Sequence, residues 1–512
     1  MKKKIIIIGA GISGLSLAAR LLYKGFDVTI YEKNSRVGGK TNIIKSGNFK
    51  FDLTASIAMM PEDLVNVFKY CNKSYGNYFS LVPLSPLYRC FYNDNSFYDF
   101  YSDLPALNRN LKTLVENDID DIKGYYDFIS MNYKKHLQIN KNILEKSYVK
   151  PYSILRPSTI RNTENLNLST SCANECKKYI KNQKLLDFLM FQSMYIGISP
   201  FNSSSIFNTI PAVSQMDGLY YVKGGFYNYV LALKKLVMEL GGIIKTNKDV
   251  SSIMFRKNEA YGIICNDKEI KSDAVVCCCD YRNTITNLIK TPDIKKLFLN
   301  KRKYEYSCSV FMLYLALDKK YPILKVHNLF LNKDFKKNVN SAFKGIMPAN
   351  PSLYIYCPSS IDNTLCSEGC ETINVMIRVP NLSFKRIHWD FDTCLKIKKQ
   401  ILRILSSIKT MEDIKHHILY DNFLTPLDLR DKFNLFEGCA FGISPSLKES
   451  VILRPQCTNP KIKNLYFTGT DMHPGNGISL CLKSSKICAE RIFRDYNKVP
   501  GKKIFNVKSK NR

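Results

Sequence analysis

Several common signatures are missing from this 512-residue chain. It contains 17 cysteines, but no two of them have the CxxC spacing of a zinc site, so we expect no bound metal. No run reaches the roughly 18 uninterrupted apolar residues that a membrane-spanning helix needs. The longest apolar region, residues 185–198, is interrupted by Asp187, Gln192 and Ser193. The absence of a solenoid repeat and of a coiled-coil heptad excludes both kinds of elongated protein.

Acidic residues are also scarce. Asp and Glu number 44 against 75 Lys and Arg, which gives a formal net charge of +31. This charge suits nucleic acid, an anionic membrane surface, or a lysine-rich surface that is merely solvated. A nucleic-acid-binding module would show a recognition helix, zinc knuckles or an aromatic RNP-type strand, and none is present. We therefore expect no nucleic acid partner, while the membrane and solvation interpretations both stay open.

The cysteines indicate a reducing compartment. Their number is odd, and Cys277, Cys278 and Cys279 are adjacent, where disulfide geometry prevents easy bridging. Buried free thiols are typical of cytoplasmic proteins. Because 45% of the residues are hydrophobic and 12% aromatic, we expect a globular protein, with a length that suits roughly two to four domains.

The chain opens with a strand, a glycine turn, a helix and a second strand. Ile5–Ile8 is a β-branched run typical of a strand buried in a parallel sheet. Leu15–Tyr23 has a helical pattern, and Asp27–Tyr31 is a strand that ends on Glu32. Further along, Tyr229–Leu240, residues 243–246 and residues 250–255 repeat this α/β pattern. Helical stretches around residues 118–146 and 173–195 and alternating runs at 307–317 and 353–356 indicate other layers.

The glycine turn, residues 9–14, has the dinucleotide-binding pattern Gly-x-Gly-x-x-Gly. The first glycine makes a tight turn, the second lets the backbone approach a pyrophosphate, and the third allows the helix to pack closely on the sheet. The helix N-terminus then faces the phosphate charge, and the Glu32 carboxylate accepts hydrogen bonds from ribose hydroxyls. The predicted contacts are Gly9, Ala10, Gly11, Ser13, Gly14 and Glu32.

Residues 32–40, Glu-Lys-Asn-x-x-Val-Gly-Gly-Lys, resemble the extension after the second strand in the FAD-binding family of amine oxidases and carotenoid desaturases. Other segments are similar to bacterial-type phytoene and dehydrosqualene (diapophytoene) desaturases, in the family's order and spacing, from about residue 4 to 495. These segments are 51–53, 59–61, 191–197, 222–225, 306–309, 440–442, 464–469 and 473–477.

The resemblance implies an α/β fold with a discontinuous Rossmann-like FAD-binding domain, a mixed β-sheet substrate domain and a helical cap. On this chain the FAD-binding domain would comprise residues 1–70, 215–295 and 425–496. Residues 71–214 would form the helical cap and part of the substrate domain, residues 296–424 the β-rich substrate domain, and residues 497–512 a basic tail.

The resemblance also implies further contacts to FAD. Lys40 would support the diphosphate, although the family usually has Arg there, and Lys lacks its bidentate fork. Val250 falls where relatives clamp the adenine. Asp471 either binds a ribityl hydroxyl or is a simple turn or cap residue. The implied contacts are Lys33, Gly38, Gly39, Lys40, Val250, Gly469, Asp471, Gly477 and Ile478.

The implied reaction removes a hydride from an allylic carbon of an isoprenoid polyene to the flavin, with loss of a proton from the neighbouring carbon. His473 is the candidate catalytic base, or else it only holds a turn. Residues 191–197 and 306–309 look most like the dehydrosqualene branch. The expected substrate is therefore a long apolar isoprenoid, taken from a bilayer by a cytoplasmic protein that docks peripherally on the anionic surface of the cytoplasmic membrane.

Two departures from the family leave alternatives open. Relatives read Asp-x-Gly-Pro-Thr where this chain has residues 52–56, Asp-Leu-Thr-Ala-Ser, and Asn476 and Ser479 stand where Ala and Pro are common. Thr54 tolerates positive φ and close backbone approach less well than glycine. The alternatives are a terminal oxidase or isomerase of the same family, or a flavin-binding protein that has lost catalysis.

Overall fold

The structure is a computed structural model that describes residues 2–149, 168–298 and 303–497. Apart from Asn497, the predicted basic tail lies outside the described residues.

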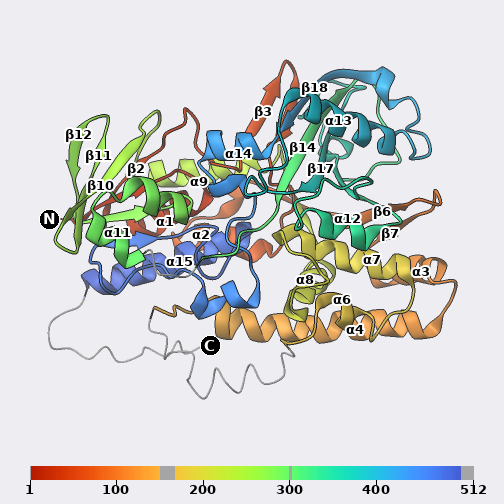
Figure 1. The fold of residues 1–512 in the computed structure, drawn as a ribbon, viewed down its shortest axis with the longest axis horizontal. Coiled ribbons are helices and arrows are strands. Elements are labelled where there is room, and N and C mark those ends of the chain that lie inside the picture. The colour runs from red at the N-terminus through yellow and green to blue at the C-terminus, as the bar shows by residue number, and fades with distance from the viewer. Residues whose placement is uncertain (1, 150–167, 299–302, 498–512) are drawn as a thin grey trace.

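A five-stranded parallel sheet has the strand order β19-β13-β1-β2-β9, and its strand β2 is labelled on the left of Figure 1. β1 lies at the centre, and its residues Ile5–Ile8 are all buried because they are apolar on both faces. Distant parts of the chain supply the strands, which are β1 Lys4–Ile8, β2 Asp27–Tyr31, β9 Ile243–Lys245, β13 Ala274–Cys277 and β19 Leu465–Phe467.

Helices and a small sheet pack against these parallel strands. α1 (Ile12–Tyr23) contacts both α9 (Tyr227–Glu239) and α15 (Ile478–Tyr496), and its first ten residues are buried. A three-stranded antiparallel sheet contacts β13 through β11. Its strands are β10 Val250–Arg256, β11 Glu259–Cys265 and β12 Lys268–Lys271.

A seven-stranded mixed sheet occupies the upper right of Figure 1, in the order β18-β14-β17-β16-β15-β6-β7. All neighbours are antiparallel except β15 and β6. The predicted β layer therefore gains two strands from residues 88–100. The strands are β6 Tyr88–Tyr92, β7 Phe97–Phe100, β14 Ser309–Leu317, β15 His327–Leu331, β16 Leu353–Tyr356, β17 Glu371–Val379 and β18 Ile418–Leu424.

Helices α3, α4, α6, α7 and α8 form a layer at the lower right of Figure 1. The helix predicted around residues 173–195 is two helices, α6 and α7, separated by residues 177–182. The Asp121 carboxylate accepts hydrogen bonds from the backbone N–H groups of Lys181 and Asn182, and this holds the break. The layer consists of α3 Leu104–Leu114, α4 Ile119–Ile139, α6 Cys172–Cys176, α7 Gln183–Gln192 and α8 Thr209–Met216.

The described residues also form other α-helices and strands. They are α2 Pro61–Tyr70, α10 Tyr281–Asn283, α11 Pro292–Phe298, α12 Phe335–Ser341, α13 Phe391–Leu405, α14 Pro426–Phe433, β3 Ile43–Ser46, β4 Phe49–Asp52, β5 Leu81–Pro83 and β8 Tyr220–Val222. Within the described residues, no helix combines the length and apolar character needed to cross a membrane. The predicted α/β class, with a discontinuous Rossmann-like sheet, a mixed sheet and a helical cap, is confirmed.

Candidate functional site

A cavity of about 1120 Å³ extends from the parallel sheet to the helical layer. Its first part, the nucleotide compartment, lies at the carboxyl ends of β1, β2, β13 and β19, where doubly wound folds bind their ligands. Its second part, the apolar arm, is lined by residues of α4, α8, β14 and β17. Every predicted site residue except Ala10 and Gly14 lines this cavity.

The glycine turn joins β1 to α1 and forms one wall of the nucleotide compartment. A Cβ atom on Gly11 would have no protein atom within 4 Å, so the backbone there borders open space. A Cβ atom on Gly14 would lie 2.1 Å from the Gly9 carbonyl oxygen, so Gly14 serves the packing of helix on strand. The first turn of α1 carries no acidic side chain, which leaves the partial positive charge of its N-terminus available to an anion.

Glu32 lies buried just after β2. Its carboxylate accepts hydrogen bonds from the backbone N–H groups of Ala10 (2.8 Å) and Asn34 (2.9 Å). Ala10 therefore holds Glu32 in place and does not border the cavity. Lys33 and Val250 line the same end of the compartment, where burial lowers the pKa of the Lys33 ammonium.

Lys40 and Thr54 lie together on another wall. The Lys40 ammonium donates to the Ala440 carbonyl at 2.8 Å, and burial lowers its pKa. The Thr54 hydroxyl donates to the Lys40 carbonyl at 2.9 Å. Thr54 is not among the described residues with positive φ. The departure from glycine at this position therefore imposes no left-handed backbone.

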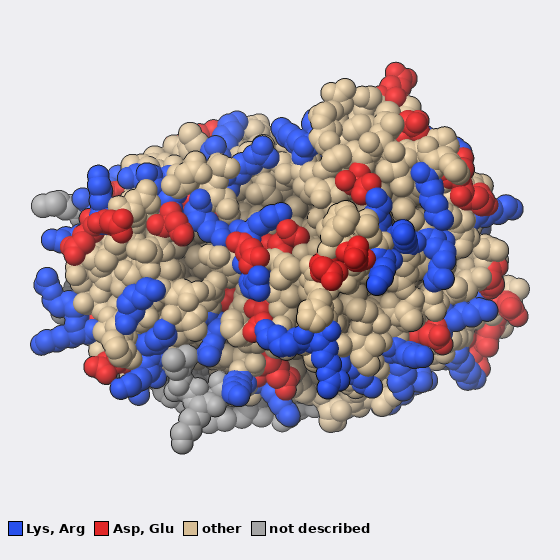
Figure 2. Space-filling view, turned by 45° about the horizontal axis from the view of Figure 1, so that its top comes forward, with Lys and Arg blue, Asp and Glu red and all other residues tan. Residues whose placement is uncertain are grey.

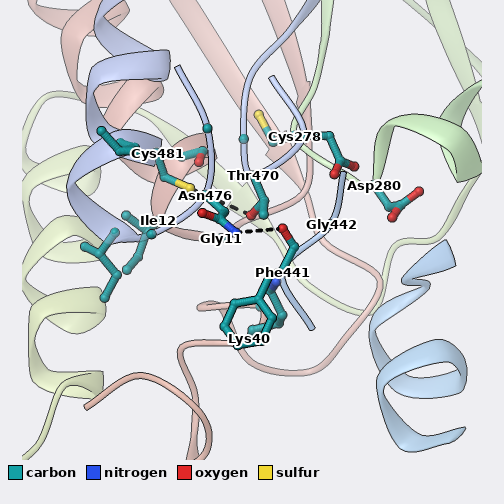
Figure 3. A pocket seen from close by; sticks show the side chains of 18 of the residues that line it. Gly11, Ile12, Lys40, Cys278, Asp280, Phe441, Gly442, Thr470, Asn476 and Cys481 are labelled. Carbon is teal, nitrogen blue, oxygen red and sulfur yellow. Dashed lines mark hydrogen bonds between the residues drawn. The ribbon is translucent and has the colours of Figure 1, made fainter. Parts of the chain in front are cut away.

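Two buried carboxylates, Asp280 and Asp471, line the compartment beside Lys40 (Asp280 and Lys40 are labelled in Figure 3). Asp471 accepts from the backbone N–H groups of Tyr281 and Ile443, at 2.9 and 2.8 Å. Burial, and then the charge of Asp471, raises the pKa of Asp280 to about 7. The contact of Asp471 with a ribityl hydroxyl stays a prediction.

Asp280 was not among the sequence-predicted site residues, although a signal for it exists. It is the first acidic residue after the buried strand β13, and the carboxyl ends of parallel strands face the ligand in this class of sheet.

Helix α15 begins at the compartment, with Gly477 as its N-cap and Ile478 as its first residue. The Asn476 amide donates to the carbonyls of Ile196 (2.9 Å) and Phe441 (3.0 Å), the second of which is drawn in Figure 3. The Ser479 hydroxyl donates to the Met59 carbonyl at 2.9 Å. Both departures from the family pattern near residue 477 therefore tie separate segments together around the start of α15.

His473 lies on the cavity wall with 3% of its surface exposed. Its ring packs edge-on against Tyr148, with 5.2 Å between ring centroids. Backbone hydrogen bonds from the ring to Ile143 and Lys146 act to raise its pKa, but less strongly than burial lowers it. Burial lowers the pKa of His473 to about 4, so the imidazole is neutral at physiological pH.

The apolar arm is lined chiefly by aliphatic side chains. Leu168 and Leu447 line the cavity and are also 36% and 41% exposed, so the cavity wall reaches the molecular surface beside them. Arg378 is a buried cation in the same wall. The aliphatic lining includes Ile57, Ile139, Ile143, Ile206, Ile210 and Val213.

These residues fit FAD. The open space at Gly11 admits a diphosphate, the Glu32 carboxylate lies at the end of β2 where a ribose is bound in such folds, and the starts of α1 and α15 both reach the cavity. Residues 12–316 match the family described as flavin containing amine oxidoreductase. Fold and site thus define an FAD-dependent oxidoreductase.

Relatives and solved structures narrow this class. Over 497 residues the chain is 32% identical to the 4,4'-diapophytoene desaturase (4,4'-diaponeurosporene-forming) of Staphylococcus haemolyticus, which covers 96% of this chain and 99% of that protein. An oxidoreductase from Methanosarcina mazei shares the fold with a TM-score of 0.64 at 15% identity, over 95% of this chain and 100% of that one. Cyclohexylamine oxidase from Brevibacterium oxydans has a TM-score of 0.61 at 11% identity, over 97% and 100%. The chain belongs to the carotenoid desaturase family of FAD-dependent oxidoreductases.

Proposed function

We propose that this enzyme introduces conjugated double bonds into an isoprenoid polyene precursor in carotenoid biosynthesis, with dehydrosqualene as the leading substrate and phytoene as the second. The observation that carries this proposal is the apolar arm, which is continuous with the nucleotide compartment. A hydrocarbon chain offers no polar group, so its affinity comes from contact with aliphatic walls of this kind. The similarity to the staphylococcal diapophytoene desaturase supports the same substrate class.

Bound FAD supplies the hydride acceptor for this reaction. We propose that residues 9–14 bind its diphosphate and Glu32 its ribose. Residues 477–478, at the start of α15, would bind the flavin end. The aliphatic side chains of the arm hold the polyene in register and exclude water from the reacting carbon atoms.

We propose that His473 accepts the proton that leaves the polyene. Its ring is neutral at physiological pH and lines the cavity that would hold the polyene. His473→Gln should keep FAD and lose roughly 100-fold or more of the desaturation rate. The matched control is His136→Gln, a second cavity histidine.

Because the neutral ring of His473 accepts the proton, the wild-type desaturation rate should hold from pH 8 down to about 5 and fall as the pH approaches the pKa of about 4. Full activity of His473→Gln would remove this role.

Co-expression with a dehydrosqualene synthase or a phytoene synthase tests the reaction. We expect new polyene absorption at longer wavelength than that of the precursor, together with a yellow purified protein. An aldehyde product would assign the chain to the terminal oxidases of the family. Unchanged precursor, with FAD still bound, would instead mean that catalysis has been lost.

We also propose that the protein docks on the cytoplasmic face of an anionic membrane, from which an apolar substrate reaches the arm. The exposed apolar side chains Leu168 and Leu447 border the cavity, and Leu453 nearby in sequence is 44% exposed. On the face shown in Figure 2, Lys and Arg are spread over the surface among acidic residues rather than gathered in one patch. The net charge of +31 would therefore attract the protein to an anionic membrane without a single basic patch. The exposed side chains of Leu168, Leu447 and Leu453, which we call the apolar rim, would make the apolar contact with the lipid.

Sedimentation with vesicles tests docking. We expect binding to anionic vesicles at low salt and release at about 0.5 M salt, where screening is nearly complete. Leu447→Ser should weaken binding, whereas Leu419→Ser, 58% exposed and outside the cavity lining, should not. If both variants bound the vesicles equally well, the apolar rim would have no role in membrane docking.

A further inference from the structure

Arg378, on strand β17, is a buried cation whose partners are all neutral. Its Nε and Nη2 atoms donate to the Met194 carbonyl at 3.0 and 2.6 Å, and Nη1 contacts the Met376 sulfur at 2.8 Å. The guanidinium lies 4.8 Å from the centroid of the Phe441 ring. It is 7% exposed, lines the apolar arm and forms no ion pair with a carboxylate of the described residues.

Two other buried arginines, Arg89 and Arg454, are better satisfied. Arg89 forms two hydrogen bonds with the Asp99 carboxylate, both 2.7 Å long. Arg454 donates to five backbone carbonyls. Arg378 has one carbonyl and a thioether, which is a weak acceptor. An uncompensated buried charge is unfavourable, and the described residues supply no carboxylate to Arg378, so the guanidinium favours an added acceptor.

A second, small cavity lies on the other side of this wall. Its volume is about 20 Å³, enough for one water-sized group, and Met376 and Arg378 line both cavities. Asn338 also lines it, and the buried Nδ2 atom of Asn338 has no hydrogen-bond partner among the described residues. Asn338 and Arg378 therefore both bring hydrogen-bond donors to the small cavity.

We propose that Arg378 binds a carboxylate end group of a long unsaturated chain whose apolar body lies in the arm. The carboxylate replaces the Met376 sulfur as the acceptor of Nη1. The inference rests on the proposed function only in that the arm takes a long apolar chain. It adds a ligand class, oxygenated chains, because a pure hydrocarbon makes no use of a guanidinium.

Fluorescence titration of the FAD-bound enzyme with parinaric acid, a conjugated tetraene fatty acid, tests this against parinaric acid methyl ester. The two probes share the same chain and differ in the charge of the end group. We expect the acid to bind about tenfold or more tightly than the ester, the scale of one charge-assisted hydrogen bond. Equal affinities on the wild-type enzyme would overturn the inference, and this comparison does not depend on whether a variant folds.

Variants then locate the effect. Arg378→Met should abolish the preference for the acid, and Arg378→Lys should keep part of it. The control is Arg430→Met, whose guanidinium is exposed and outside the cavity lining; it should keep the full preference. A preference that survives in Arg378→Met would assign the carboxylate to another residue and overturn the inference.

Conversion of dehydrosqualene by the wild-type enzyme is measured separately. A preference for the acid without conversion supports the role of Arg378 and removes the proposed function. Conversion without a preference for the acid overturns the role of Arg378 and leaves the proposed function in place.

Discussion

At the scale of single residues, Gly11 is the position of the glycine turn that leaves space for a ligand. Gly11 has an ordinary backbone φ of −72°, and a side chain there would extend into open space. Gly11→Val should therefore fold, yet it should purify without FAD because its methyl groups occupy the approach of the diphosphate.

The matched control is Gly76→Val, because a Cβ atom at Gly76 also meets no protein atom within 4 Å and lies outside the cavity lining. Flavin absorbance of the purified proteins and circular dichroism check both variants. Normal flavin content in Gly11→Val would mean that residues 9–14 do not bind the cofactor.

The raised pKa of Asp280 should make the stability of the folded protein depend on pH. Its pKa rises from an ordinary 3.8 to about 7 in the folded protein, so the folded state holds this proton more tightly than the unfolded chain does. The stabilisation of the folded state by this proton is complete below about pH 4 and is lost as the pH rises through 7. Asp280→Asn removes the ionisation, and its single carbonyl oxygen keeps an acceptor for one of the two N–H groups, of Asn283 and Phe436, that donate to the carboxylate.

The free energy of unfolding of the wild type, relative to Asp280→Asn, should therefore fall between pH 4 and 7 and stay level above it. Urea unfolding at a series of pH values, with FAD present throughout, measures this difference. A difference that grows with pH would contradict the assigned direction of the pKa shift.

At the scale of elements, a buried ion pair fastens α4 to α6. The Lys135 ammonium lies 2.7 Å from the Glu175 carboxylate, with both side chains less than 10% exposed, and the Asn208 amide donates to the same carboxylate. This pair fixes the helical layer whose residues line the apolar arm.

Lys135→Ala leaves the Glu175 charge buried and should lower the free energy of unfolding by about 3–5 kcal/mol. Lys181→Ala removes the same side chain from an exposed pair with Asp120 and should change it by less than about 1 kcal/mol. Chemical denaturation measures both. If the two variants lost similar amounts of unfolding free energy, burial would not explain the contribution of the Lys135–Glu175 pair to stability.

The elements differ in how far local sequence determines them. β1 follows directly from an apolar run, because burial on both faces of a sheet needs no more than that pattern. β2 and β16 likewise follow from short local patterns. The break between α6 and α7 was not predicted, because Asp121, which holds it, lies about 60 residues away. The membership of β6 and β7 in the large sheet depends in the same way on pairing with β15, more than 200 residues later.

At the scale of the whole molecule, the nucleotide compartment joins strand ends from the first, middle and last parts of the chain. A ligand bound there holds these segments together and stabilises the folded state by mass action. FAD at about 100 times its dissociation constant should add about 2.7 kcal/mol to the free energy of unfolding and raise Tm by roughly a few degrees.

Thermal unfolding of FAD-depleted protein, with and without added FAD, measures this rise. Gly11→Val is the control and should show none. An equal rise in both proteins would place the stabilising flavin outside the glycine turn.

The sequence by itself determined the dinucleotide turn, the acidic residue after the second strand and the likeness to carotenoid desaturases, because each depends on residues close together in the chain. Only the tertiary structure decided that Thr54 needs no left-handed backbone, that the charge of Asp471 acts on Asp280, and that Arg378 is buried with no carboxylate partner in the described part of the chain. The physical reason is that the pKa and hydrogen bonding of a buried group are set by neighbours in space, and in this fold those neighbours come from distant parts of the chain.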